Sequence, residues 1–277
     1  MSIVSGSHGE SGDMNLSIII PAAGSSTRFG NRDKLREEIG GRPLLVRTIE
    51  TFAASAAVNQ IIVVGPPDDL PEFRERFGPA LSFHGVQIVP GGRESRWQSV
   101  AAGLKAVSEN ATHIGVHDAA RPGLTEGLLN RLLETALYVD AVIPVLKVNA
   151  TVKRVGQLED VGGREDELEV LADSILGGSS DSSIKAAAIE ETVDRTGLVL
   201  AQTPQVFKAA LLHRAYSEGH AQDTTDDAQA VERAGARVYT IDGEARNLKV
   251  TTRADVDLVT SLMGLKPDAQ RPTHKRF

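Results

Sequence analysis

Residues 18–34, with the sequence IIIPAAGSSTRFGNRDK, decide the fold of this chain. The three isoleucines at 18–20 end at Pro21 and open into small residues, which predicts a buried strand followed by a tight turn. Small residues let main-chain amides approach anionic oxygens, and two cations, Arg28 and Lys34, follow the turn. This pattern suits a loop that binds a triphosphate.

The loop departs from the two commonest phosphate-binding motifs. No Gly-Lys-Ser/Thr follows it, so it is not a Walker motif, and Gly24 and Gly30 do not fall as G-x-G-x-x-G. The alternative interpretation is that this stretch binds no ligand and is a strand, a glycine turn and two solvated basic residues. The order strand, Pro-Ala-Ala-Gly, Arg and Lys resembles the signature of sugar-nucleotide pyrophosphorylase-like nucleotidyltransferases.

Composition bounds the remaining possibilities. With 277 residues, 41% of them hydrophobic, the chain fits one large α/β domain or two small ones. A net charge of -7 argues against nucleic-acid partners and against a basic membrane-binding surface. The absence of cysteine excludes disulfides, thiolate catalysis and Cys-ligated metals, and is compatible with a cytoplasmic location.

No stretch of the sequence is expected to span a membrane. No apolar run approaches the ~20 residues of a membrane span. Residues 1–15 are rich in Ser and Gly and lack the apolar core of a signal peptide, so we expect a flexible extension. Residues 266–277 are expected to form a frayed basic tail.

Strand and helix patterns alternate along the chain. This alternation predicts an α/β fold with a mainly parallel twisted sheet, covered by helices on both faces, and with ligands at the carboxyl ends of the strands. After residue 148 the alternation stops, and it returns near residue 198. Strands are expected at 61–64, 86–89, 113–117, 141–148, 198–201 and 238–241, and helices at 44–52, 70–77, 97–107, 206–216, 224–231 and 254–263.

Two further strand ends carry polar residues. Residues 91–96, GGRESR, lead into a helix that Ser95 can cap, which places Arg96 and Ser99 near its free amides. Residues 117–122, HDAARP, follow the fourth strand, and their Asp118 could bind a ribose hydroxyl or help to place Mg²⁺. An ordinary capped surface helix and a turn-forming Asp are the alternatives.

Six motifs occur in the order found in 2-C-methyl-D-erythritol 4-phosphate cytidylyltransferases, and the chain resembles that family over about 17–265. The resemblance implies a Rossmann-like nucleotide-diphospho-sugar transferase fold, with one catalytic domain over 16–265 and an extended β-arm over 148–197 for homodimerisation. It also implies transfer of CMP from CTP to 2-C-methyl-D-erythritol 4-phosphate in isoprenoid biosynthesis (the MEP pathway). The motifs are PAAGSSTRFG with Lys34, GGRESRWQSV, HDAARP, TVDR at 192–195, TPQ at 203–205 and NLKVT at 247–251.

The same resemblance implies roles for single residues. The implied catalytic residues are Arg28, Lys34, Lys249 and Arg195, the last supplied by the partner chain. Magnesium, or another divalent cation, would bind mainly through the phosphates of CTP, with Asp118 as a further candidate ligand. The implied nucleotide-binding residues are Pro21, Ala22, Ala23, Gly24, Gly91, Gly92, Arg96, Ser99, Asp118 and Ala119. The implied acceptor-binding residues are Arg121, Thr151, Lys153, Arg195 and Thr203.

Other functions stay open. Relatives that make CDP-ribitol share most of these motifs, so ribitol 5-phosphate is an alternative acceptor. A catalytically silent module that binds a nucleotide and a protein partner is an alternative of another class. A serine hydrolase is not supported, because no G-x-S-x-G is present. His113 and His117 share a strand face, but no third zinc ligand is evident nearby.

The chain departs from the family pattern in several places. Residues 156–190 are longer than the usual hairpin and contain an acidic run and a Ser/Gly-rich stretch, which are typical of a flexible, solvated loop. Asp33 stands where the family often has Pro, and Ala150 where it has an acidic residue. One extra residue precedes Arg96, so Arg93 is a poor candidate for a contact with the base.

Overall fold

The computed structural model describes residues 14–24, 29, 33–161 and 184–265. The chain divides into two compact units. The first unit is Met1–Leu146 together with Ala201–Phe277, and the second is Lys147–Leu200. Within the described residues, no helix is long and apolar enough to cross a membrane.

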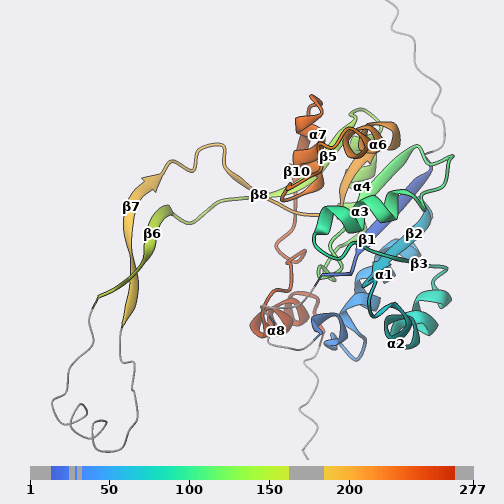
Figure 1. The fold of residues 1–277 in the computed structure, drawn as a ribbon, viewed down its shortest axis with the longest axis horizontal. Coiled ribbons are helices and arrows are strands. Elements are labelled where there is room, and N and C mark those ends of the chain that lie inside the picture. The colour runs from blue at the N-terminus through green and yellow to red at the C-terminus, as the bar shows by residue number, and fades with distance from the viewer. Residues whose placement is uncertain (1–13, 25–28, 30–32, 162–183, 266–277) are drawn as a thin grey trace, which may run out of the picture. The chain divides into compact units, whose positions relative to one another are not determined.

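The first unit is built on a mostly parallel sheet (Figure 1). Its strands follow the order β10-β5-β9-β4-β1-β2-β3, and β8 (Val199–Ala201) pairs with β5 off this path. The central strand β1 is parallel to both neighbours, with Ile19 opposite Ile62 on β2 and Val116 on β4. The bounds are β1 (Leu16–Pro21), β2 (Val58–Gly65), β3 (Gln87–Pro90), β4 (His113–Val116), β5 (Ala141–Lys147), β9 (Gln205–Lys208) and β10 (Tyr239–Asp242).

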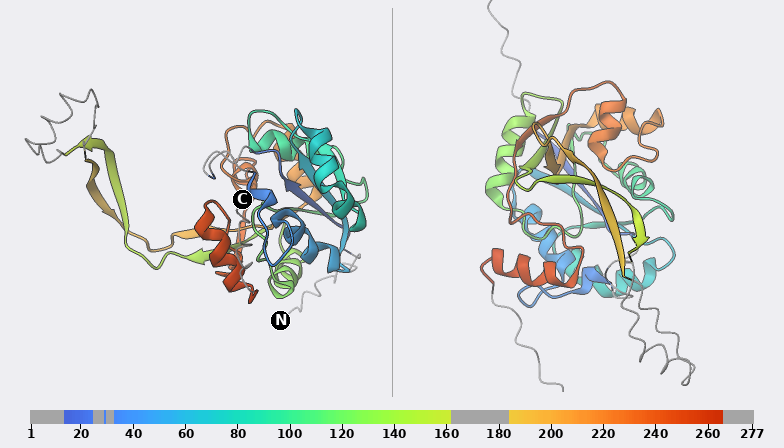
Figure 2. Two further views of the ribbon diagram at one scale, coloured as in Figure 1. Left: turned by 90° about the horizontal axis from the view of Figure 1, so that it is seen from below. Right: turned by 90° about the vertical axis from the view of Figure 1, so that its left-hand side faces the viewer.

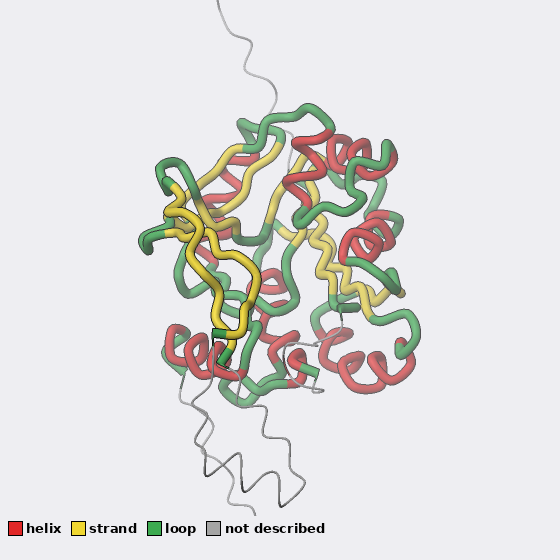
Figure 3. Tube along the Cα trace, turned by 60° about the vertical axis from the view of Figure 1, so that its left-hand side comes forward, coloured by secondary structure: helices red, strands yellow, loops and turns green. Residues whose placement is uncertain are grey.

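Alternate residues of β1 belong to opposite hydrophobic cores, because successive side chains of a strand point to opposite faces. Leu16, Ile18 and Ile20 are fully buried in one core, and Ile19 is fully buried in the other. The predicted cover of helices on both faces is therefore confirmed (Figures 2 and 3). The first core is covered by α1 (Leu44–Ala54), α2 (Leu70–Phe83), α4 (Glu126–Ala136) and α8 (Arg253–Leu262), and the second by α3 (Arg96–Leu104), α6 (Ala209–Ser217) and α7 (Asp227–Arg233).

The helix expected over 206–216 begins later than the sequence predicts. Residues 205–208 form β9, which is antiparallel to β4 and β5, and α6 begins only at Ala209. Val206 and Phe207 are fully buried in opposite cores, so both faces of this segment are covered. A strand can bury consecutive residues in this way, whereas a surface helix buries one stripe.

Two helices begin at polar residues, but only one of these residues makes a capping hydrogen bond through its side chain. Asp226 occupies the N-cap of α7 and accepts a hydrogen bond from Gln229 N at 3.0 Å. Ser95 occupies the N-cap of α3, but its side chain makes no capping hydrogen bond. Ser95 therefore marks the start of the helix as expected, but the expected capping hydrogen bond is absent.

The second unit is a two-stranded antiparallel sheet of β6 (Val152–Asp160) and β7 (Lys185–Val193). Val152 pairs with Val193 at one end and Asp160 with Lys185 at the other. The expected loop over 156–190 is therefore wrong at both its ends, where cross-strand pairing overrides the polar composition. The acidic run and the Ser/Gly-rich stretch lie outside the described residues.

Candidate active site

A cavity of about 430 Å³ lies at the carboxyl ends of β1, β3 and β4. The sequence predicts ligands at this edge of the sheet, and most of the candidate nucleotide-binding residues meet there. Lys34 and Lys249 line the same cavity. Arg28 lies outside the described residues. The candidate nucleotide-binding residues that line the cavity are Pro21, Ala22, Ala23, Gly24, Gly92, Arg96, Ser99, Asp118 and Ala119.

The glycines after β3 are required by close approach to neighbouring atoms. A Cβ at Gly92 would lie 2.1 Å from the Cβ of Gln98, and one at Gly91 would lie 2.9 Å from Ala23 Cβ. The amide of Gly92 donates to Ser99 Oγ at 3.2 Å, which ties the loop to α3. Gly91 does not line the cavity, and packs behind the first loop instead. Any larger residue at either position would displace the wall of the cavity.

At the cavity, Asp118 forms ion pairs with three basic residues. Its Oδ2 lies 3.0 Å from Lys249 Nζ and 3.1 Å from Arg121 Nε, and its Oδ1 lies 3.5 Å from Arg96 Nε. Burial alone would raise the pKa of Asp118, but these three cations hold it well below its ordinary value. The carboxylate is therefore ionised near neutral pH, and it holds three cations around one point.

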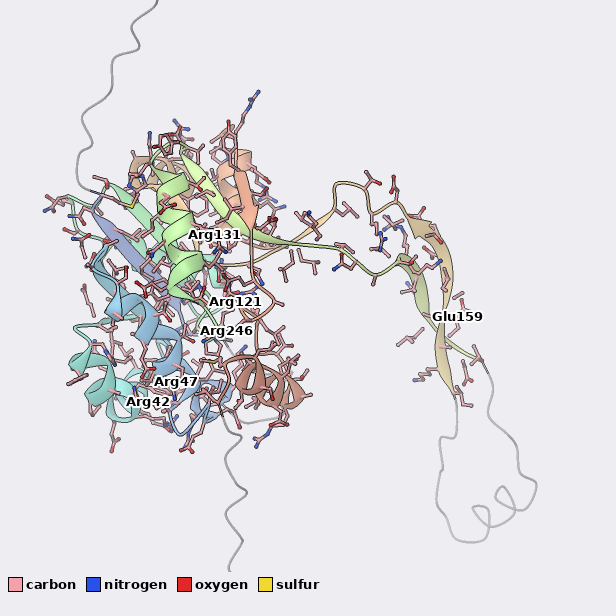
Figure 4. All side chains as sticks on the ribbon, turned by 180° about the vertical axis from the view of Figure 1, so that it is seen from behind. Arg42, Arg47, Arg121, Arg131, Glu159 and Arg246 are labelled. Atoms are coloured by element: carbon pink, nitrogen blue, oxygen red, sulfur yellow. The ribbon has the colours of Figure 1, made fainter. Side chains whose placement is uncertain are left out.

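Lys249 reaches this point because main-chain bonds anchor its segment. Val250 N donates to Ala120 O at 2.8 Å, which joins NLKVT to HDAARP. The side chain of Asn247 donates to Thr203 O at 2.7 Å, and Arg121 Nη1 donates to Asn247 O at 2.9 Å. Figure 4 shows Arg121 close to Arg246, the residue before Asn247. Three motifs that are distant in the sequence are thus joined by hydrogen bonds.

His117 and Thr203 support Asp118 from behind. Asp118 N donates to Thr203 Oγ at 3.0 Å, and the Thr203 hydroxyl lies 3.1 Å from His117 Nδ1. His117 Nε2 lies 3.1 Å from Arg121 O, a carbonyl that only accepts, so Nε2 carries the proton and Nδ1 accepts from Thr203. Burial lowers the pKa of His117 to about 4, which agrees with a neutral ring.

Two candidate acceptor-binding residues belong to this support. Thr203 is 4% exposed, and neither Thr203 nor Arg121 lines the cavity. The hydroxyl of Thr203 is used by Asp118 and His117, and the guanidinium of Arg121 by Asp118 and Asn247. The assignment of both to the acceptor remains a prediction, and their contacts give them a role in positioning Asp118.

Asp227 contacts a candidate nucleotide-binding residue, Arg96, at a place where the sequence favours a helix cap and gives an acidic residue only a minor role in the site. The sequence reads residues 224–227 as a helix cap, but Asp227 is fully buried and pairs with Arg96, its Oδ2 lying 2.8 Å from Nη2. Tyr216 donates to Asp227 Oδ1 at 2.5 Å. The sequence signal for a second role was the pair of consecutive Asp residues, because only one of them can occupy the N-cap and the other needs a different explanation.

Two of the residues at which the chain departs from the family pattern, Asp33 and Arg93, make local contacts. Asp33 accepts from Leu35 N at 3.0 Å and caps the short 3-10 helix η2 (Lys34–Arg36), so it fixes the turn that carries Lys34. It also lies 3.5 Å from Arg76 Nη1. Arg93 lines the cavity, and its exposed guanidinium pairs with Asp68 at 2.8 Å. That Arg93 does not contact the base stays a prediction.

Three candidate residues lie in the second unit. Lys153 on β6 donates to Thr192 Oγ at 2.5 Å, and Arg195, just after β7, donates to Asn149 O. Thr151 is exposed and directly precedes β6. Because Val152 pairs with Val193, all three residues lie at the same end of this sheet. The structure thus brings together Thr151, Lys153 and Arg195 within the second unit.

The donor set of the cavity suits a cation that arrives with a nucleotide. Among the described residues, no group of three or more His, Cys, Asp or Glu could hold a metal, so a zinc site at His113 and His117 is not supported. Of the residues that the structure describes, Asp118 and Glu94 are the carboxylates that line the cavity. Oδ1 of Asp118, paired with Arg96 only at 3.5 Å, retains capacity for one Mg²⁺ contact.

Comparison with known proteins points to one family. The sequence model described as 2-C-methyl-D-erythritol 4-phosphate cytidylyltransferase matches residues 16–173 and 171–264. The protein of that name from Chromobacterium violaceum is 37% identical over 257 residues, which cover 90% of this chain and 98% of the relative. The one from Synechocystis sp. is 33% identical over 250 residues, which cover 89% of this chain and 96% of the relative.

Solved structures agree. The structure of 4-diphosphocytidyl-2C-methyl-D-erythritol synthase from Anaerococcus prevotii has a TM-score of 0.68 at 25% identity and covers 91% of this chain and 97% of its own. The structure of 2-C-methyl-D-erythritol 4-phosphate cytidylyltransferase from Thermus thermophilus has a TM-score of 0.66 at 31% identity. The match covers 91% of this chain and 100% of the Thermus thermophilus chain.

Proposed function

This chain belongs to the 2-C-methyl-D-erythritol 4-phosphate cytidylyltransferase family, and we propose that it is the enzyme which transfers CMP from CTP to 2-C-methyl-D-erythritol 4-phosphate. The products are 4-diphosphocytidyl-2-C-methyl-D-erythritol, an isoprenoid precursor, and pyrophosphate. The structural observation that carries the proposal is the meeting of Lys34, Lys249 and Asp118 with the loop of residues 21–24 in one cavity.

The reaction needs charge stabilisation more than a base. A phosphate oxygen of the acceptor attacks the α-phosphorus of CTP, and the bond from that phosphorus to the oxygen that bridges to the β-phosphate breaks. The attacking phosphate monoester has a second pKa of about 6, so it is already ionised near neutral pH. The enzyme must hold two anions in line and stabilise the additional negative charge of the five-coordinate transition state.

The residues of the cavity divide this work. Main-chain amides of residues 21–24 and the cations Arg28 and Lys34 bind the triphosphate in this proposal. Lys34 and Lys249 are assigned to the α-phosphate, where a cation that meets the transition state better than the ground state accelerates the step, and Arg28 is assigned to the β- and γ-phosphates. Asp118 supports this role because it holds the Lys249 ammonium 3.0 Å from its Oδ2.

A divalent cation completes the nucleotide site. Magnesium takes hard oxygen ligands and usually rides on substrate phosphates, which suits a cavity with few carboxylates. When bound, it would neutralise part of the triphosphate charge and stabilise the leaving pyrophosphate. Asp118 Oδ1 is the protein oxygen that we assign to it.

The acceptor site is proposed to include a second copy of the chain. Thr151, Lys153 and Arg195 lie at one end of the β6–β7 sheet, and Lys153 and Arg195 carry the charge that a phosphate requires. We assign Arg195 to the active site of the partner chain in a homodimer. A cytoplasmic location belongs to the same proposal, since CTP and a polyol phosphate are charged metabolites.

The test is magnesium-dependent release of pyrophosphate from CTP with either methylerythritol phosphate or ribitol 5-phosphate, beside UTP, ATP and GTP. Release with CTP and methylerythritol phosphate, abolished by EDTA and restored by excess Mg²⁺, is the expected result. A preference for ribitol 5-phosphate would move the protein to CDP-ribitol synthesis. Binding of CTP without release of pyrophosphate would favour the catalytically silent module.

A further inference from the structure

We propose that Tyr216 and Asp227 are positioning residues that hold Arg96 in the orientation needed to bind the nucleotide. Neither residue lines the cavity, and they lie on α6 and α7, which cover the second core. Within the described part of the chain, their polar contact with the lining of the cavity is made through the guanidinium of Arg96. The inference rests on the proposed function, because it takes CTP as the ligand of the cavity.

A continuous chain of polar contacts carries the inference. The Tyr216 hydroxyl donates to Asp227 Oδ1 at 2.5 Å, and Asp227 Oδ2 accepts from Arg96 Nη2 at 2.8 Å. Arg96 Nε in turn faces Asp118 Oδ1 at 3.5 Å. Asp227 is fully buried, and both of its oxygens are occupied. The chain therefore links α6 and α7 to Asp118 through the first residue of α3.

The start of α7 does not need Asp227, because another residue caps the helix. Asp226 already caps α7 by accepting from Gln229 N, and Gln205 fixes the same helix end by donating to Asp226 Oδ2 at 2.7 Å and accepting from Ala228 N at 2.9 Å. Asp227 is not needed for the cap. Its position is explained by the charge of Arg96, since a fully buried carboxylate requires a cation and hydrogen bonds as partners.

Tyr216 contributes a donor that does not titrate. Burial and the neighbouring carboxylate of Asp227 hold the pKa of Tyr216 well above its ordinary value, so the phenol keeps its proton. It occupies Oδ1 of Asp227 and leaves Oδ2 for Arg96. Losing this donor would leave one oxygen of a buried carboxylate without its partner, and the carboxylate could then rotate toward the guanidinium.

Arg96 keeps donors for a ligand. Its Nε faces Asp118 and its Nη2 faces Asp227, while Nη1 has no partner in the described part of the chain. A guanidinium presents five N–H donors in a fixed planar fork, so fixing Nε and Nη2 also fixes the direction of Nη1. Because Arg96 lines the cavity, this third nitrogen is the group that we assign to the nucleotide.

The experiment measures the Kd of CTP with Mg²⁺ by calorimetry and by the fluorescence of Trp97, the single tryptophan, which follows Arg96 on α3. Tyr216→Phe is expected to weaken CTP about tenfold, the scale of coupling between residues that share a network. Asp227→Asn should weaken CTP at least as much. Tyr138→Phe, at a tyrosine that is 87% exposed, is the matched control and should leave the Kd unchanged.

A double-mutant cycle separates positioning from general structure. In an Arg96→Ala background, Tyr216→Phe should have no further effect on CTP, because the residue through which it acts is absent. In steady state the KM for CTP should rise while the KM for the acceptor stays unchanged. Equal effects of Tyr216→Phe with and without Arg96, or a parental Kd in Tyr216→Phe, would overturn the inference.

The two proposals fail in different ways. If the parent protein does not bind CTP, the proposed function fails and this inference fails with it. If the parent binds CTP and releases pyrophosphate but the cycle shows no coupling, the inference alone is wrong. Thermal unfolding of each variant identifies any loss of affinity that comes from a loss of folded protein.

Discussion

The ammonium of Lys249 lies 3.0 Å from Oδ2 of Asp118, although the two residues come from motifs far apart in the sequence. The lysine side chain is 42% exposed, and the aspartate side chain is only 11% exposed. The pair therefore holds an accessible cation against a buried anion. In the proposed reaction, a phosphate oxygen that enters the cavity would meet a lysine that is already oriented, and a preorganised site of this kind stabilises developing charge.

The first prediction concerns Lys249. Lys249→Ala should lower kcat about a hundredfold or more, since removal of one preorganised stabiliser has this effect in other enzymes. The measurement is the rate of pyrophosphate release at saturating CTP and acceptor. Lys105→Ala, an exposed lysine just after α3 that does not line the cavity, is the control and should keep parental turnover. Near-parental turnover of Lys249→Ala would contradict the assignment.

The second prediction concerns the hydroxyl of Thr203. Thr203→Val leaves the amide of Asp118 and Nδ1 of His117 without their partner, so it should lower the free energy of unfolding by about 1–3 kcal/mol. Thr203→Ser keeps the hydroxyl and should cost less. Urea unfolding at neutral pH measures both. Equal losses in the two variants would show that the methyl group, and not the hydroxyl, is responsible.

The third prediction is a pH dependence of stability from His117. Its pKa is lowered from 6.5 to about 4 on folding, so between these values the unfolded chain binds a proton that the folded chain does not. The free energy of unfolding should therefore fall as the pH is lowered from about 6.5 to about 4, by about 3 kcal/mol in total.

Urea unfolding at several pH values tests the contribution of His117. In His117→Gln this part of the pH dependence should disappear, whatever the stability at neutral pH. His213→Gln, at an exposed histidine, should keep the parental slope. An unchanged slope in His117→Gln would assign the titration to another group. Asp118 adds a loss of the same sign only at lower pH, because its pKa is held below its ordinary value.

The fourth prediction concerns the assignment of Arg195 to the partner chain. Arg195→Ala and Lys249→Ala chains should each be inactive alone, but dimers that contain one chain of each kind should regain activity. In such a dimer one site combines an intact Lys249 with the intact Arg195 of the partner chain. Separately tagged chains, co-expressed and purified through both tags, allow the measurement. Mixed dimers as inactive as their parents would place Arg195 in its own chain's site.

Local patterns were sufficient for much of the fold. The run of isoleucines at 18–20 predicts a buried strand, and in the structure Ile18 and Ile20 enter one core and Ile19 the other. The helices that begin near Pro43 and Asp226 also follow from local capping and periodicity. At β9, local periodicity failed, because its backbone conformation depends on the strands β4 and β5 that pair with it.

The sequence by itself determined the motifs and the edge of the sheet at which they meet, because the carboxyl ends of parallel strands share one side. The tertiary structure alone decided which side chains pair there. The Tyr216–Asp227–Arg96 chain and the Thr203–His117 contact depend on the packing of elements distant in sequence, and no local spacing encodes such contacts. The tertiary structure also decided that Asp118 is a shared anion, since its three cations come from α3, its own loop and the NLKVT segment.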